Sequence, residues 1–223
     1  MKRSNVLTVA GVSTLLAAWT GHAQSVNNFY FDTGLGAAFQ QDASIHTSAF
    51  GNSGNVEFDP GIRADLHFGY NITRCFAAEL ESGVIWNNIK NFQTPGGDNK
   101  ASTLGYSAEL YEVPVLANFI YRPLHGAFQP YIGVGCGGTA GIFDSENVPL
   151  YSNANSGRFN ANDWTFAYQA ELGLKYAITS SIQLGLGYEF LGTTSHDWTD
   201  NGYTLKTGGT MTHAVVASFT WEF

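Results

Sequence analysis

The sequence predicts an all-β chain that closes into an eight-stranded antiparallel up-and-down transmembrane β-barrel. Eight segments alternate apolar and polar residues with a period of two, which is the pattern of a strand with two different faces. Beyond the first residues, no apolar run is long enough for a spanning helix. Tight turns and long polar connections alternate along the chain, as they do in membrane barrels. Because lipid cannot satisfy an open sheet edge, strands that span a membrane must close into a barrel.

The last segment, 211–223, shows the alternation most clearly. A strand of this length, tilted by about 45°, spans about 30 Å along the membrane normal, which is one hydrocarbon thickness. One face is small or polar, whereas the other is apolar and increasingly aromatic toward the end. The apolar face consists of Met211, His213, Val215, Ala217, Phe219, Trp221 and Phe223.

Seven earlier segments repeat this pattern, with aliphatic and aromatic side chains on the outward face and glycine or ionised residues on the inward face. They are expected at 28–40, 56–70, 75–86, 109–122, 128–143, 163–177 and 181–191. Residues 71–74, 123–127 and 178–180 form tight turns, and residues 41–55, 87–108, 144–162 and 192–210 form long polar loops. An even strand count places both ends of the barrel chain on the tight-turn side, so the four long loops face outward from the cell.

The N-terminus has the layout of a secretory signal peptide. Lys2 and Arg3 precede an apolar run over 6–19, and Gly21-His22-Ala23 offers small residues for cleavage. We therefore expect a signal peptide over 1–23 and a barrel domain over 24–223. The formal charge is −8, or −10 without the two basic residues of the signal, which argues against nucleic acid as a partner.

Several segments resemble the small opacity-protein and outer membrane protein A type barrels. Residues 113–122 and 129–137 are similar to the fourth and fifth strands of that family, and 63–70 also fits. The resemblance implies a Gram-negative outer membrane location after export, contact with membrane lipid and lipopolysaccharide, insertion by the barrel-assembly machinery, and a monomer. We expect no peptidoglycan-binding domain after Phe223. The terminal assembly signal of the family corresponds to Phe219, Trp221 and Phe223.

The inward faces carry the most distinctive chemistry, a lumen charge network with seven acids and three bases. An eight-stranded barrel is just wide enough for side chains to fill it, so these groups must be paired, hydrated or protonated. Arg63 is expected at mid-height, near Glu81, Glu112, Glu171 and Glu189, as the principal counter-charge. The network comprises Asp32, Arg63, Asp65, Glu79, Glu81, Glu112, Arg122, Glu171, Lys175 and Glu189.

No catalytic, cofactor or metal site is predicted. His213 lies outward near the outer membrane surface, but its same-face neighbour is Val215 and not a serine nucleophile. Adjacent residues such as Ser195-His196-Asp197 rarely meet with triad geometry. The histidines lack the paired spacings of a zinc site, and Cys75 and Cys136 are interpreted as isolated thiols.

The expected function is therefore non-enzymatic, a structural or surface-interaction role through four extracellular loops. The alternative is a narrow, porin-like passive pore for small solutes or cations along the polar lumen. A lipid A-modifying enzyme is a third possibility, because some small barrels have that activity.

Overall fold

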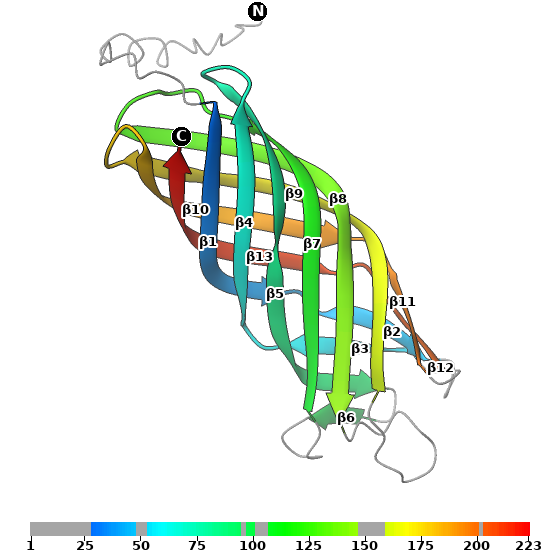
Figure 1. Cartoon of the computed structure of the whole chain (residues 1–223). Coiled ribbons are helices and arrows are strands. Elements are labelled where there is room, and N and C mark those ends of the chain that lie inside the picture. The colour runs from blue at the N-terminus through cyan, green and yellow to red at the C-terminus, as the bar shows by residue number, and fades with distance from the viewer. Residues whose placement is uncertain (1–27, 48–52, 95–96, 101–106, 147–158, 201–202) are drawn as a thin grey trace, which may run out of the picture.

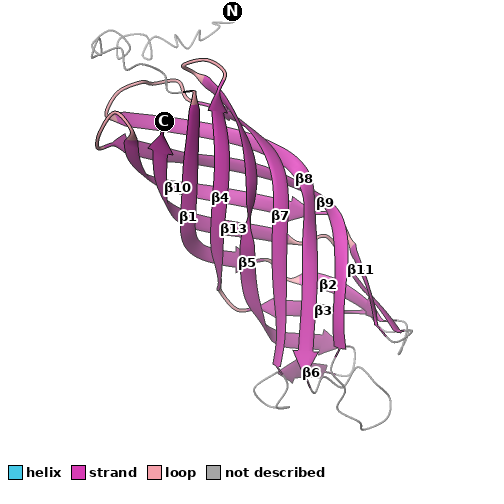
Figure 2. Ribbon diagram, in the orientation of Figure 1, coloured by secondary structure: helices cyan, strands magenta, loops and turns pink. Residues whose placement is uncertain are grey.

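The computed structural model describes residues 28–47, 53–94, 97–100, 107–146, 159–200 and 203–223. Within these ranges every regular element is a strand (Figure 2). Eight long strands form a closed antiparallel barrel, as predicted (Figure 1). These strands are β1 (Phe29–Gln40), β4 (Gly61–Asn71), β5 (Phe76–Thr94), β7 (Ser107–Tyr121), β8 (Phe128–Glu146), β9 (Phe159–Ala177), β10 (Ile182–Thr193) and β13 (Met211–Glu222).

The barrel closes through its first and last strands. β1 pairs with β4 on one side and with β13 on the other, in a continuous register that matches Phe31 with Trp221 and Phe39 with His213. Each of the eight strands therefore has two hydrogen-bonded neighbours, which leaves no open edge facing lipid. Phe223 ends the chain beside β1, where its backbone N–H donates to the carbonyl of Phe29 (3.0 Å).

The two ends of the barrel differ. At one end, which we call the turn end, short connections join β4 to β5, β7 to β8 and β9 to β10, and the C-terminus lies there too (Figure 1). At the other end, the sheet continues past the positions where the sequence predicted loops. β5 runs to Thr94, β8 runs to Glu146 and β9 begins at Phe159.

The predicted long loops also contain strands of their own, which corrects the simple loop assignment. Strands β2 (Ala43–Thr47), β3 (Ser53–Phe58), β6 (Gly97–Lys100), β11 (His196–Asp200) and β12 (Tyr203–Thr207) continue the sheet in the order β11-β12-β2-β3-β5, with β6 against β5. We call these strands, with the adjoining parts of β5, β7, β8 and β9, the extension. The polar composition of these segments concealed their pairing, which depends on partners far apart in the chain.

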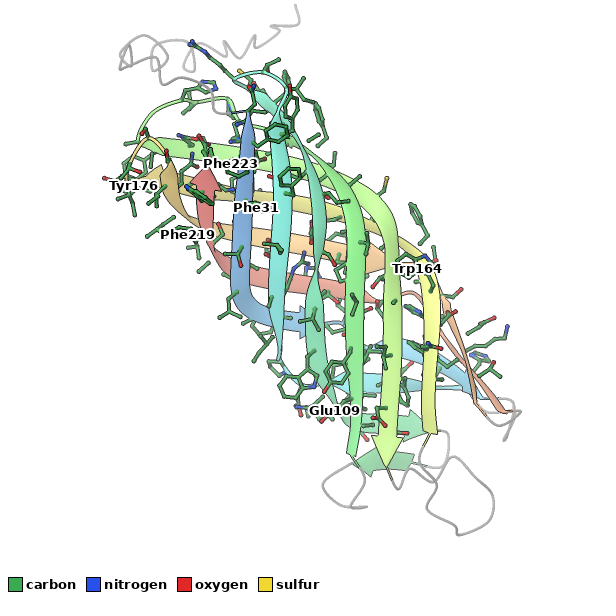
Figure 3. All side chains as sticks on the ribbon, in the orientation of Figure 1. Phe31, Glu109, Trp164, Tyr176, Phe219 and Phe223 are labelled. Atoms are coloured by element: carbon green, nitrogen blue, oxygen red, sulfur yellow. The ribbon has the colours of Figure 1, made fainter. Side chains whose placement is uncertain are left out.

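The predicted inward and outward faces are confirmed in the eight barrel strands. The single strand expected over 56–70 is an exception, because it divides into β3 and β4 at 59–60; Asp59, expected inward, is exposed, and Val56 is buried. Leu35 and Leu186 point outward with 63% and 62% exposure, whereas the residues beside them in sequence are buried or half-buried. Aromatic rings gather outside the turn end, where Phe223 stacks with Phe31 at 5.6 Å (Figure 3). Trp164, labelled in the same view, lies toward the extension. Such aromatic groups favour the two membrane interfaces.

Among the described residues, no helix is long and apolar enough to cross a membrane.

Candidate functional site in the barrel lumen

The lumen of the turn-end half holds most of the ionisable groups that the sequence assigned to it. All ten members of the predicted network are buried, with no more than 7% exposure each. Nine of them lie on β1, β4, β5, β7, β9 and β10, and Arg122 directly follows β7. One side chain in two on each strand points inward. Glycines between them leave room for long side chains. The structure thus brings these residues into one enclosed polar interior, although not all of them into mutual contact.

Among the arginines and lysines of this interior, Arg63 has the most acidic neighbours. Its Nε lies 3.2 Å from Asp65 Oδ2 and 2.6 Å from Glu189 Oε2. One of its two terminal nitrogens, Nη2, donates to Glu81 Oε1 at 2.6 Å. The same nitrogen donates to Gln169 Oε1 at 2.8 Å. A guanidinium suits this position because it presents a rigid fork of donors to several carboxylates at once.

Two of the acids expected near Arg63 have other surroundings. Glu112 lies at the same height, since both residues register with Ile85, but its carboxylate accepts a hydrogen bond from Thr210 (2.8 Å). Glu171 has neither a hydrogen bond nor an ion pair within the described part of the chain. The heights along the barrel that the sequence predicts could not reveal these different surroundings, because the Arg63 side chain turns toward Glu81, nearer the turn end.

Neutral partners and a histidine complete the network, and the sequence had not assigned them to it. His67 lies between two acids, with Nδ1 3.1 Å from Glu79 Oε2 and Nε2 3.2 Å from Asp65 Oδ1. The amides of Asn118 and Gln169 donate to Glu81 Oε2 at 2.6 and 2.5 Å. His67, Asn118 and Gln169 each lie at an inward position of the strand alternation. That position is the sequence signal from which their place in the network could have been predicted.

A second polar group lies closer to the turn end. Lys175 forms an ion pair with Asp32, whose Oδ2 also accepts from Thr220 (2.9 Å). Arg122 donates to the hydroxyl of Tyr30 (2.9 Å) and to Asn71 Oδ1 (2.8 Å). The Tyr30 hydroxyl in turn donates to Glu79, which connects this group to the network around Arg63.

Toward the extension, the lumen also contains two clusters of buried apolar side chains. A first buried cluster contains Ala38, Ile85, Leu116, Ala167 and Leu191. A larger cluster inside the extension contains Ile45, Val56, Ile89, Ala108, Leu110, Phe143, Ala161 and Trp198.

Trp198 lies at the centre of the extension, with 1% exposure, and it packs where Gly141 has no side chain. His196 stacks on its ring, with centroids 4.8 Å apart. Burial lowers the pKa of His196, although the Asp163 carboxylate, 3.5 Å from Nδ1, opposes this effect.

The two histidine arrangements considered for catalysis do not resemble a hydrolase triad. His213 faces outward, with Nδ1 2.6 Å from the Tyr188 hydroxyl and Nε2 2.8 Å from Gln41 Nε2. In the 195–197 run, His196 points into the extension, whereas Asp197 points outward and pairs with Lys206 at 3.0 Å. Alternation along β11 therefore separates the imidazole from its neighbouring carboxylate.

One group of side chains has the spacing of metal ligands. One atom each from Asp65, His67 and Glu189 lies within 4.8 Å of the others. Arg63 already bonds both of these carboxylates, so the position holds a protein cation. Cys75 and Cys136 are both free thiols, and Cys136 is exposed on the outer wall.

The whole chain can be compared with known proteins. Residues 7–223 match the model of the outer membrane protein beta-barrel domain. The fold is similar to that of the outer membrane protein OprG from Pseudomonas aeruginosa, with a TM-score of 0.58, 17% identity and coverage of 89% of this chain and 97% of OprG. It is also similar to the outer membrane protein AlkL in lipid bilayers, with a TM-score of 0.55, 18% identity and coverage of 92% and 96%.

No curated protein matches the sequence. The family match, which spans nearly the whole chain, agrees with the closed eight-stranded barrel, the apolar outer wall and the aromatic rings at its ends. The chain therefore belongs to the outer membrane protein beta-barrel family and resides in the outer membrane of Gram-negative bacteria.

Proposed function

We propose that this protein is a closed, non-enzymatic barrel that anchors a rigid surface-interaction module, the extension, outside the cell. The observation that carries the proposal is the filling of the lumen. Charged side chains occupy the turn-end half, and two apolar clusters follow one another toward the extension. A solute that entered from either end would have to displace bonded ion pairs and packed hydrophobic side chains.

The extension supports the surface role. It has its own apolar interior around Trp198, so its strands have a packed support. Its outer face is charged, as the exposed pair of Lys206 and Asp197 illustrates. Charged side chains on an outer wall favour water over lipid, so this part of the barrel belongs beyond the membrane. A rigid sheet above the membrane presents side chains in fixed positions to a partner.

The closed lumen is tested by conductance of the purified, refolded protein in a planar bilayer. We expect no steady current above that of the bare bilayer, while a porin under the same conditions conducts. Steady wild-type conductance would reject the closed barrel and favour the narrow pore.

The surface role is tested with a barrel in which residues 43–56 and 196–207 are each replaced by a short turn. We expect this variant to insert and to resist unfolding on cold SDS gels as a folded barrel does. Cells that carry it should lose the adhesion to matrix proteins, polysaccharides or one another that cells with the intact protein gain. Equal behaviour of the two strains in all of these assays would contradict the surface role.

A further inference from the structure

Two of the three turns at the turn end have the same structure. The turn after β4 contains Ile72 and Thr73, and the turn after β9 contains Ile178 and Thr179. In each turn the threonine hydroxyl accepts hydrogen bonds from the backbone N–H groups two and three residues later, at 3.0–3.2 Å. The N–H of each threonine donates to the carbonyl of the residue that begins the next strand. Three backbone donors are therefore satisfied within each short segment.

The isoleucine of each turn is exposed and continues the spacing of the lipid-facing side chains. Ile72 and Ile178 are both 53% exposed. Each follows an outward tyrosine by two residues, Tyr70 on β4 and Tyr176 on β9, which is the spacing of side chains on one side of a strand. Tyr176 lies at the turn end of the barrel (Figure 3). The third turn presents Leu124, which is 41% exposed. One exposed aliphatic side chain would be ordinary, but all three turns carry one.

The charges of the three turns also differ from those of the whole chain. The chain has 18 acidic residues against 10 lysines and arginines, yet segments 72–75, 122–127 and 178–181 contain no acid. Arg122 is turned into the lumen, whereas Arg74 is exposed. The exposed His125 connects two of the turns, because its Nε2 donates to the carbonyl oxygen of Arg74.

The exposed surface of the turns is thus apolar and basic. A phospholipid layer offers acyl chains to apolar side chains and phosphate groups to basic ones, so this surface is complementary to it. The surface is also continuous with the apolar outer wall, on which Phe68, Tyr70, Leu174 and Tyr176 are exposed. Backbone N–H groups that have partners within the turn can enter a poorly hydrated layer, where unsatisfied donors are costly.

We propose that the three turns insert into the headgroup region of the phospholipid leaflet around the turn end, with Ile72, Leu124 and Ile178 as apolar anchors. The lipid-facing surface of the barrel then includes the turns and does not stop at the last strand residues. Arg74 reaches the phosphate groups of the same leaflet. The anchors fix the depth of the barrel in the membrane, and with it the height of the extension above the opposite surface.

The test measures the depth of a fluorescent label on the turns. The full chain with Cys75→Ser and Cys136→Ser receives one new cysteine, Ile178→Cys, which is labelled with an environment-sensitive dye. The protein is refolded in vesicles of phosphatidylcholine alone. We expect blue-shifted emission, and stronger quenching by phosphatidylcholine brominated near the headgroup than by lipid brominated near the ends of the acyl chains.

Two control positions calibrate the depth. Leu186→Cys labels an outward residue within β10, and it should be quenched more by bromine near the chain ends. Lys206→Cys labels the exposed outer face of the extension, and it should show red-shifted emission without quenching. If Ile178→Cys does not fold, Ile72→Cys provides the same measurement on the matching turn. Red-shifted, unquenched emission at both isoleucine positions would overturn the proposal and favour a periplasmic protein as the occupant of this surface.

A second experiment tests the anchoring itself. The label is placed at Leu124→Cys, with and without the pair of substitutions Ile72→Asn and Ile178→Asn. We expect a loss of quenching by lipid brominated near the headgroup in the doubly substituted protein, because the turns lose two of their three apolar contacts. Unchanged quenching of this label would show that the isoleucines do not hold the turns in the leaflet, and would also overturn the proposal.

Discussion

The barrel and its extension are built from one continuous sheet, yet their interiors have opposite chemistry. In the turn-end half, the inside carries ionisable side chains around Arg63 and the outside is apolar. In the extension, the inside is apolar around Trp198 and the outside carries charges such as Lys206. The surrounding solvent explains the difference, because lipid accepts hydrophobic side chains and water accepts charged ones. One strand can serve both environments if its pattern changes along its length.

Strand β8 illustrates that change. Near the turn end its inward positions are glycines such as Gly133 and Gly135, which make room for polar side chains from other strands. Farther along, Phe143 points inward and packs on Trp198, with ring centroids 6.0 Å apart. The extension thus has the interior of a soluble barrel, mounted on a membrane barrel. The two parts should respond differently to the same kind of mutation.

The largest effect is expected from Arg63→Ala. The substitution leaves three buried carboxylates without their counter-charge, which we expect to cost about 3–5 kcal/mol of barrel stability. Urea unfolding in detergent or lipid vesicles, followed by gel mobility, measures this. Removal of the exposed charge in Lys206→Ala should cost no more than about 1 kcal/mol. Equal stability of Arg63→Ala and wild type would refute the lumen network.

Trp198→Ala should have a large but local effect. Loss of a buried tryptophan costs about 3–5 kcal/mol, and here it removes the centre of the extension core. We expect faster amide exchange and proteolysis in β2, β3, β11 and β12, with an intact barrel on gels. Trp164→Ala is the control, because this tryptophan points outward with 60% exposure. Uniform destabilisation of the barrel by Trp198→Ala would show that the two regions unfold as one unit.

Phe223→Asp should have a modest effect on stability and a stronger one on assembly. The ring closes a group with Phe29, Phe31 and Trp221, and a carboxylate there would meet the membrane interface. We expect less folded protein in the outer membrane of cells that express the variant. Phe39→Asp makes the same change on the outward face at the other end of β1. If both variants assemble equally well, the terminal residue is not a special signal.

The smallest expected effect is the pH dependence of the stability of the extension. Burial lowers the pKa of His196, so the folded extension favours the neutral imidazole. The unfolded form takes up a proton first, and stability should therefore fall as the pH drops below about 6.5. Amide exchange of β11 at pH 7.5 and 5.5 measures this. His196→Gln should remove this pH dependence of amide exchange. His125→Gln, which changes a histidine at the turn end, should leave it as in the wild type. Identical pH dependence in His196→Gln would assign the effect to another group.

Much of the fold could be predicted from local pattern. The alternation in 211–223 and in the seven earlier segments identified the barrel strands, because a residue's side of the sheet depends only on its place in the strand. The same rule placed the ten network residues inside the lumen. The polar segments at the other end gave no such signal. Their strands are held by partners such as β12 and β2, which are distant in sequence.

The sequence by itself determined the barrel, its two faces and the identity of the lumen charges, since strand alternation is a local property. Only the tertiary structure decided which charges meet. Closure of the sheet directs Arg63 toward Asp65, Glu81 and Glu189, and it leaves Glu171 opposite Glu189 beside a cavity. It also gathers residues from six other strands into the core around Trp198 of β11. Such contacts depend on strand register and side-chain reach across the lumen, which no single segment of the sequence encodes.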